Sequence, residues 1–201
     1  IFIQNFRSLM LRCLDDDTKF LDLSKYESVQ CIGRGSFACS YLMREFNTNN
    51  FYLFRIINCK RDEVKPFLES IESIKHINLP NFNKIYYYNL LKNFIGIPST
   101  LYDHIEDSFY GEPILFIVEY FQNNDLDSLI QKYLQGENTI LTPTIRNKII
   151  FGVACAMKYL HKNKILYRDL KPRHIFLNDN LEPVLSFCSL NHILSEDRKI
   201  D

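Results

Sequence analysis

Three runs with the alternating pattern of β-strands follow one another near the start of the chain, separated only by short turns. They are Tyr26–Ile32, Ala38–Glu45 and Phe51–Cys59, and β-branched and aromatic residues are common in all three. A glycine-rich turn joins the first run to the second, and Asn47–Asn50 joins the second to the third. This pattern predicts a strand meander, and it restricts the chain to folds that contain an antiparallel sheet.

Helical spacing replaces the alternation after the third run. Apolar residues recur there at three- and four-residue steps, which predicts a helix that stops before Pro80. These residues are Phe67, Leu68, Ile71, Ile74 and Ile77. Farther along, Ile114–Phe121 is apolar except at Glu119 and predicts another strand.

A second, longer helix has a marked start. Thr142 is a favoured N-cap residue, and Pro143 follows it at the first helical position. The helical pattern then continues to His161, and we expect one stripe of this helix to be buried. The stripe consists of Ile145, Ile149, Ile150, Val153, Met157 and Leu160.

Residues 1–25 form an extension before the meander. Its first part, Ile1–Leu14, has apolar residues at helical spacing, and the acidic run Asp15–Asp17 ends the pattern. The apolar residues are Phe2, Phe6, Leu9, Met10 and Cys13. We expect this extension to pack on the domain or on a partner. Because the first residue is not methionine, we also expect the N-terminus to be a cut edge.

Size and composition argue against several classes of protein. A chain of 201 residues can bury one sizeable core or two small lobes. Its 24 basic and 24 acidic residues balance, so we expect neither a nucleic acid nor a membrane partner. No apolar run reaches the roughly 18 residues of a membrane helix, and the start is unlike a signal peptide. The six cysteines have no zinc-site spacing, which is typical of reduced, mostly buried thiols in a cytoplasmic protein.

Two motifs resemble those of protein kinases. Leu166–His174 resembles the catalytic loop of that family, His-Arg-Asp-Leu-Lys-Pro-x-Asn. Ile32–Ala38 resembles the glycine-rich loop, with an alanine in place of the third glycine. The order of strands and helices is also that of a kinase. The resemblance covers Tyr26 to about Leu190, and it is weakest over residues 81–113, a segment longer than the family usually has.

The resemblance implies an α+β, protein-kinase-like fold. An N-lobe with an antiparallel sheet and one helix would occupy residues 26–121, and a partial helical C-lobe ending in the activation segment would occupy residues 122–201. In the family, later helices cover the apolar side of the long helix. We therefore expect the stripe residues Ile145, Ile149, Val153 and Met157 to lack full cover, and the chain expressed alone to self-associate or to need a partner.

The resemblance also assigns nucleotide-binding positions. They are Ile32, Gly33, Gly35, Ser40, Leu53, Arg55, Glu119 and Phe176. The glycines would let backbone N–H groups approach phosphates, although a retained hairpin turn would look the same. Leu53 and Phe176 are larger than the alanine and leucine that form the ceiling and floor of the family's adenine slot, so we expect them to fill it. Ser40, in place of a valine, returns some room.

An ion pair of the family is altered as well. Arg55 stands where the third-strand lysine is expected, and its planar fork is not interchangeable with an ammonium. Ser70 maps to the helix glutamate that should pair with this lysine. A one-residue shift would instead bring in Glu69, and this alternative stays open.

The two magnesium ligands of the family are replaced. Phe187, eighteen residues after Asp169, stands for the metal-binding aspartate, and His174 stands for the asparagine. Neither supplies the oxygen that a hard cation prefers. Asp169 and Lys171 are retained. The resemblance gives Asp169 the role of base, but Asp169 and Arg168 could persist only because they hydrogen-bond the loop backbone.

Three hypotheses follow. The first is a catalytically impaired pseudokinase that acts as a binding or allosteric module, with a protein partner and no cofactor. The second is an active ATP-dependent serine/threonine kinase with atypical site residues, which would use ATP and magnesium. The third is a decayed gene product without function.

Overall fold

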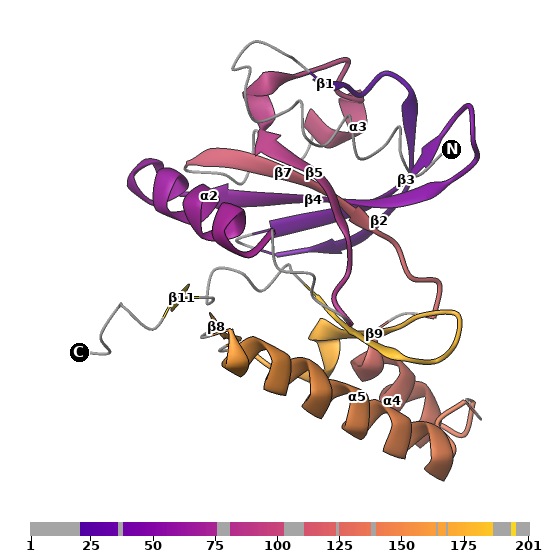
Figure 1. Ribbon diagram of the computed structural model, residues 1–201. Coiled ribbons are helices and arrows are strands. Elements are labelled where there is room, and N and C mark those ends of the chain that lie inside the picture. Colours follow the sequence, from indigo (N-terminus) through magenta and orange to yellow (C-terminus); the bar gives the residue numbers. More distant parts are fainter. Residues whose placement is uncertain are drawn as a thin grey trace. The chain divides into compact units, whose positions relative to one another are not determined.

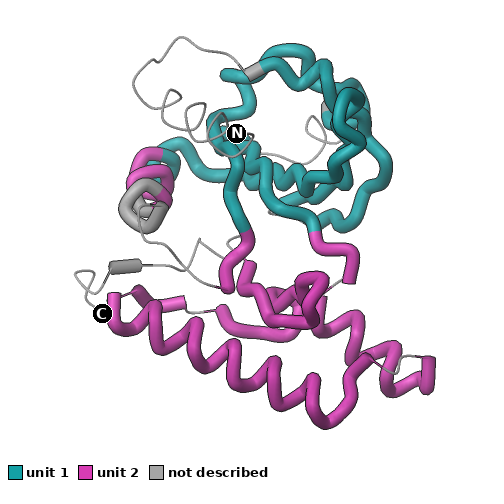
Figure 2. The backbone as a smooth tube through the Cα atoms, turned by 45° about the vertical axis from the view of Figure 1, so that its right-hand side comes forward, with its two compact units in different colours: residues 1–64, 84–120 teal, residues 65–83, 121–201 magenta. Residues whose placement is uncertain are grey.

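The computed structural model describes most of the chain as two compact units. The described residues are 21–35, 38–75, 81–102, 111–123, 125–137, 140–163, 165–167, 169–186 and 194–195. Unit 1 comprises residues 1–64 and 84–120, and unit 2 comprises residues 65–83 and 121–201 (Figure 2). Within the described residues, no helix is both long and apolar enough to span a membrane.

Unit 1 is built on a five-stranded sheet with the order β2-β3-β4-β7-β5 (Figure 1). Its strands are β2 (Tyr26–Arg34), β3 (Ala38–Glu45), β4 (Phe51–Cys59), β5 (Ile85–Leu90) and β7 (Glu112–Glu119). All neighbouring pairs are antiparallel, so the predicted meander is confirmed. The strand expected over Ile114–Phe121 lies two residues earlier, because it pairs with β4 from Glu112 onward.

One face of this sheet is covered by short elements that we call the cap. The cap consists of β1 (Leu21–Asp22), residues 23–24, η1 (Leu91–Asn93), β6 (Phe94–Ile95), residues 96–98 and α3 (Ser99–Tyr102), and Figure 1 shows β1 and α3 together beside the sheet. β1 and β6 pair in parallel. Buried residues of the cap and of the sheet form one hydrophobic cluster. The cluster contains Leu23, Tyr26, Cys39, Tyr41, Met43, Tyr52, Phe54, Ile56, Leu91, Phe94, Leu101, Leu115 and Ile117.

A glycine allows two segments of the cap, around Ser24 and Gly96, to approach each other closely. Gly96 has a φ of +63°, a left-handed conformation that favours glycine. A Cβ atom there would lie 2.8 Å from the Ser24 amide nitrogen and 2.5 Å from a carboxylate oxygen of Asp22. That carboxylate accepts a hydrogen bond from the Ser24 amide at 2.8 Å, which lowers the pKa of Asp22. Asp22 and Ser24, near the start of the segment 21–97, therefore lie in close contact with Gly96 near its end.

Helix α2 (Arg61–Lys75) follows β4, and the boundary between the two units falls within it. Phe67 and Ile71 are buried, as the helical spacing predicted. The predicted end before Pro80, together with Ile77, lies outside the described residues.

Besides the later part of α2, the described residues of unit 2 form further helices and several short strands. They are α4 (Leu126–Leu134), α5 (Pro143–Lys162), β8 (Ile165–Leu166), η2 (Pro172–His174), β9 (Ile175–Leu177), β10 (Pro183–Leu185) and β11 (Leu194–Ser195). β9 pairs antiparallel with β10, and β8 with β11. The predicted N-cap is confirmed, because the Thr142 hydroxyl accepts a hydrogen bond from the Ile145 amide at 3.3 Å. Leu129, Leu141, Ile149 and Leu177 form a buried cluster between α4, α5 and β9.

The expected buried stripe of α5 is partly wrong. Ile149 and Leu160 are buried, but Ile150 is 68% exposed. The reason is a close approach at Gly152, where a Cβ atom would lie 2.8 Å from Cδ of Pro183 and closer still to Cγ. The helix therefore turns its glycine side toward β10, and Ile150 points away.

The cysteines also differ from expectation. The structure describes four free thiols, of which Cys39 and Cys59 are buried but Cys31 and Cys155 are exposed. Burial raises the pKa of the two buried thiols.

Candidate functional site

The glycine-rich hairpin lies between β2 and β3. The Gly35 amide donates a hydrogen bond of 2.9 Å to the Ala38 carbonyl oxygen and so begins the β3 pairing. Neither Gly33 nor Gly35 has a positive φ, and a Cβ atom at Gly33 would meet nothing within 4 Å. The described part of the hairpin therefore does not itself require glycine at position 33. Ser36 and Phe37, at the tip, lie outside the described residues, and Ile32 is exposed.

Three of the predicted nucleotide-binding residues share one face of the sheet. Ser40 lies opposite Arg55 across the β3–β4 ladder, and Leu53 occupies the next position on the same face. On the other side of β4, Phe116 lies opposite Arg55. This face is distinct from the face under the cap, to which Tyr41 and Phe54 contribute.

The Arg55 side chain is partly buried on this face. Its Nε atom is shielded from solvent and has no hydrogen-bond partner within the described part of the chain. A buried donor without a partner costs about 1–3 kcal/mol. The position that should hold a compact lysine ammonium thus holds a larger cation with one unsatisfied group.

The two acidic candidates have local partners. The Glu119 carboxylate accepts a hydrogen bond of 3.2 Å from the Lys84 amide, and the Glu119 amide donates to the Lys84 carbonyl at 2.9 Å. Glu69 is exposed on α2, and its carboxylate lies 3.9 Å from Lys65 Nζ. The Glu119 carboxylate is therefore engaged with the backbone of Lys84, and the Glu69 carboxylate with a lysine one turn earlier on α2. The side chain of Ser70 lies outside those that the structure describes.

The loop between β8 and β9 brings three predicted residues together in unit 2. Lys171 Nζ lies 2.9 Å from Oδ2 of Asp169, and His174 Nδ1 lies 3.4 Å from the same oxygen. His174 Nδ1 also lies 2.9 Å from the Asp169 carbonyl oxygen. Both neighbours of Nδ1 are acceptors, so we assign its hydrogen to Nδ1. The carboxylate of Asp169 is therefore enclosed by two basic side chains.

Backbone and phenol hydrogen bonds fix this loop. The His174 amide donates to the Lys171 carbonyl at 2.9 Å, and the Ser186 amide donates to the His174 carbonyl at 2.8 Å. The buried Tyr167 hydroxyl donates to the Ser186 carbonyl at 2.8 Å. These bonds tie η2 to the end of β10, directly before Phe187, which lies outside the described residues.

The model of one protein family matches residues 26–188, most of the chain, and its description is the protein kinase domain. The chain belongs to the protein kinase family. The order of elements agrees with this assignment, since the five-stranded antiparallel sheet of a kinase N-lobe is present in unit 1.

Curated kinases from distant organisms resemble the chain. Protein kinase 3 of Dictyostelium discoideum is 29% identical over 162 residues, which are 80% of this chain and 16% of that protein. Serine/threonine-protein kinase sgk-1 of Caenorhabditis elegans is 26% identical over 185 residues, 86% of this chain and 35% of that protein. Human ephrin type-A receptor 6 is 34% identical over 87 residues, 43% of this chain and 8% of that protein. The chain thus spans only a minor part of each relative.

The described residues of this kinase domain do not fit a magnesium ion. At the position of the asparagine ligand, His174 offers a ring nitrogen, and Nδ1 faces Asp169 rather than an open coordination position. Magnesium prefers oxygen ligands in near-octahedral geometry. Within the described residues, no group of three or more His, Cys, Asp or Glu side chains is placed to hold a metal ion.

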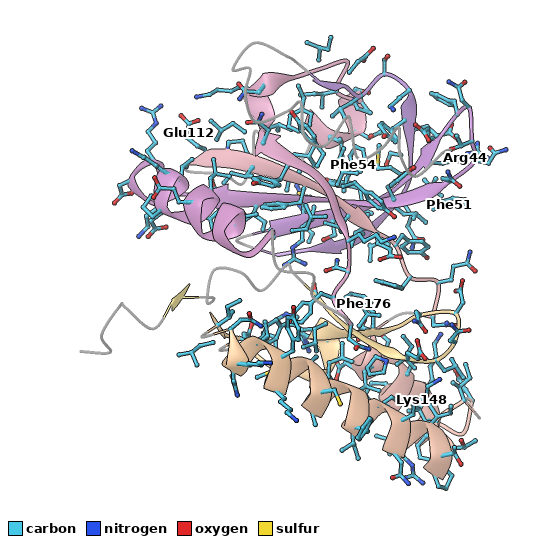
Figure 3. The ribbon with its side chains drawn as sticks, in the orientation of Figure 1. Arg44, Phe51, Phe54, Glu112, Lys148 and Phe176 are labelled. Atoms are coloured by element: carbon cyan, nitrogen blue, oxygen red, sulfur yellow. The ribbon has the colours of Figure 1, made fainter. Side chains whose placement is uncertain are left out.

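The floor position of the kinase adenine slot is held by an aromatic pair. Phe176 of β9, labelled in Figure 3, stacks on Phe121 with ring centroids 5.7 Å apart and an interplanar angle of 24°. Phe176 also forms an isolated bridge with Asp125. The sequence predicted that Phe176 fills space, but Phe121 was seen only as the end of a strand. Because the two residues are 55 positions apart, no local sequence pattern could have predicted that their rings stack.

Proposed function

We propose that this kinase domain is a pseudokinase, a module that acts by binding a protein partner or by allostery rather than by phosphotransfer. The observation that carries the proposal is the placement of His174, at the position of the family's asparagine ligand, with Nδ1 2.9 Å from the Asp169 carbonyl oxygen and 3.4 Å from its carboxylate. His174 thus offers a ring nitrogen instead of an oxygen at the position of a magnesium ligand, and this nitrogen faces the residue that would serve as base.

Other replacements support the same function. The large Phe176 occupies the floor position in a stacked pair, and Leu53 occupies the ceiling position. Arg55 keeps a positive charge but leaves its Nε unsatisfied. Loss of one positioned electrostatic group typically lowers a rate by about 10²–10³, and several such groups are altered together here. Their effects do not simply multiply, but we expect phosphotransfer close to background.

One observation favours the second candidate, an active serine/threonine kinase. Asp169 and Lys171 are both retained, and the 2.9 Å contact between them is suited to a loop that positions a substrate hydroxyl. Protein kinase 3 and sgk-1 are named as kinases, and this activity is inferred for the chain only by analogy with them.

A thermal-shift measurement with Mg-ATP tests the proposal. A ligand present at 100 times its dissociation constant stabilises a protein by about 2.7 kcal/mol, which raises the melting temperature by several degrees. We expect no change at millimolar Mg-ATP. Magnesium chloride alone, and ATP with a chelator, serve as controls for ion effects. A magnesium-dependent rise with ATP would contradict the pseudokinase function and favour the active enzyme.

A further inference from the structure

The chain enters α5 through an exposed threonine–proline pair, Thr142–Pro143. Thr142, Pro143 and the following Thr144 are all exposed. Leu141, directly before them, is only 3% exposed and belongs to the buried cluster that α4, α5 and β9 share in unit 2 (Figure 1). Because Leu141 is anchored in this cluster, the threonine–proline pair lies at a fixed place on the surface of unit 2.

The Thr142 hydroxyl is accessible to a reagent. Its oxygen accepts the capping hydrogen bond from the Ile145 amide at 3.3 Å, which is longer than usual for such a bond. The hydroxyl donates no hydrogen bond to any residue that the structure describes. The backbone of Thr142 is extended, with φ −61° and ψ 161°, and the peptide bond to Pro143 is trans. An exposed hydroxyl on an extended backbone is the form in which enzymes modify a threonine.

The residue after Thr142 narrows the class of enzyme. Proline-directed protein kinases transfer the γ-phosphoryl group of ATP to a serine or threonine that precedes a proline, and this proline is their main recognition residue. Thr142 is the only serine or threonine in the chain that precedes a proline. Thr144, in the same turn of the helix, is exposed too but is followed by isoleucine. The chain therefore offers one acceptor of this kind.

The first turn of α5 lacks the negative charge that the N-terminus of a helix favours. It contains no acidic residue, and Arg146 adds a positive charge one turn after Thr142. The Arg146 guanidinium lies over the ring of Tyr133, with Cζ 5.8 Å from the centroid, and it forms no ion pair with a described residue. A phosphate on Thr142 would thus lie near the positive end of the helix and near an arginine that has no carboxylate partner.

We propose that Thr142 is a phosphorylation site for a separate, proline-directed protein kinase, and that the phosphate strengthens the start of α5. In this reaction Oγ of Thr142 bonds to the γ-phosphorus of ATP, its proton passes to a base of that kinase, and ADP leaves. The phosphate oxygens then replace the hydroxyl as acceptors for the Ile145 amide and pair with Arg146. The modification does not depend on whether this domain itself transfers phosphate.

Incubation of the full chain with a mitogen-activated or a cyclin-dependent protein kinase and radiolabelled ATP tests the site. We expect a single phosphate, mapped to Thr142 by mass spectrometry, and none without the added enzyme. Thr142→Ala should lose the label, while Thr142→Ser, which keeps both the acceptor and a favoured N-cap, should retain it. Pro143→Ala should slow labelling about tenfold or more, because a pocket that fits the proline ring binds a smaller side chain less well.

The matched control is Thr144→Ala, which removes an exposed threonine hydroxyl from the same turn and should leave labelling unchanged. Absence of label in the parent chain with both enzymes, or label that persists in Thr142→Ala, would overturn the proposal.

Amide hydrogen exchange measures the effect on the helix. The amides of residues 144–146 should exchange about three- to tenfold more slowly in the phosphorylated chain than in the unmodified one. Arg146→Gln should reduce this difference, whereas Lys158→Gln, at an exposed position far along the same helix, should preserve it. Faster exchange after phosphorylation, or a difference that is unchanged in Arg146→Gln, would refute the strengthening of this turn through Arg146.

Discussion

Gly152 is a position at which α5 approaches β10 closely, and its replacement by alanine tests how the helix packs. A Cβ atom at this position would lie 2.8 Å from Cδ of Pro183 and nearer still to Cγ. Carbon atoms in proteins essentially never come this close. A proline ring in a paired strand cannot swing aside like a long side chain, so the helix or β10 must move.

Two opposing effects decide the magnitude. Alanine is the better helix former by about 1 kcal/mol, so Gly152→Ala would stabilise a free helix. Overpacking a filled contact costs about 1–3 kcal/mol. We therefore expect a net loss of about 0–2 kcal/mol of unfolding free energy. In Pro183→Ala the ring is gone, and adding Gly152→Ala to that variant should then cost little or even stabilise.

Urea unfolding followed by circular dichroism measures these differences, and hydrogen exchange at the amides of α5 assigns them to unit 2. The four proteins of the cycle are the parent, the two single variants and the double variant. If Gly152→Ala proves more stable than the parent by about 1 kcal/mol, the close packing against Pro183 is wrong. The rotation of α5 that leaves Ile150 exposed would then be wrong as well.

Three other predictions concern the cap, the sheet and the kinase site. Gly96→Ala should cost about 2–4 kcal/mol in a urea titration, because strain at positive φ adds to a clash with the backbone at Ser24, whereas Gly136→Ala, with open space around it, should cost only about 1 kcal/mol. Burial raises the pKa of Tyr86 to about 12, helped by the nearby carboxylate of Glu119. The neutral phenol is thus favoured in the folded state, and this contribution to stability is complete below a pH of about 10 and lost as pH rises toward about 12. The urea midpoint should therefore fall less between pH 8 and pH 11 in Tyr86→Phe than in the parent chain. An equal fall in both proteins would argue against this cause. Phe187→Asp alone should leave radiolabelled phosphate transfer to a generic substrate at background, and clear activity would show that the site fails at a single position.

The sequence predicted the strands of the meander and the start of α5 because the signals for them are local. β3 and β4 have the same first and last residues as the alternating runs of the sequence. Thr142 and Pro143 mark the start of α5, and the capping hydrogen bond reaches only to Ile145. The cap gave no such signal. Its helix has four residues and its two strands have two residues each, too few for a period to be recognised. They are held in place mainly by contacts with the sheet.

Contacts between distant residues explain the errors and omissions. Ile150 was expected to be buried because the spacing on a helix gives its apolar stripe only approximately, whereas the rotation of α5 is set by Gly152 and Pro183. For the site, motif spacing located Asp169, Lys171 and His174 correctly on one loop. It did not predict that His174 would face Asp169, since that depends on the turn of η2.

The cap also determines when unit 1 can fold during synthesis. Leu23 leaves the ribosome before Leu91 and Phe94, members of the same buried cluster, which follow almost 70 residues later. Strand β4 must likewise wait for β7, which ends at Glu119. At about 5–20 residues per second, translation from Leu23 to Glu119 takes roughly 5–20 seconds. Throughout that interval the aromatic face of the nascent sheet lacks the cover of η1, β6 and α3, so the apolar residues of β2, β3 and β4 are more accessible to chaperones.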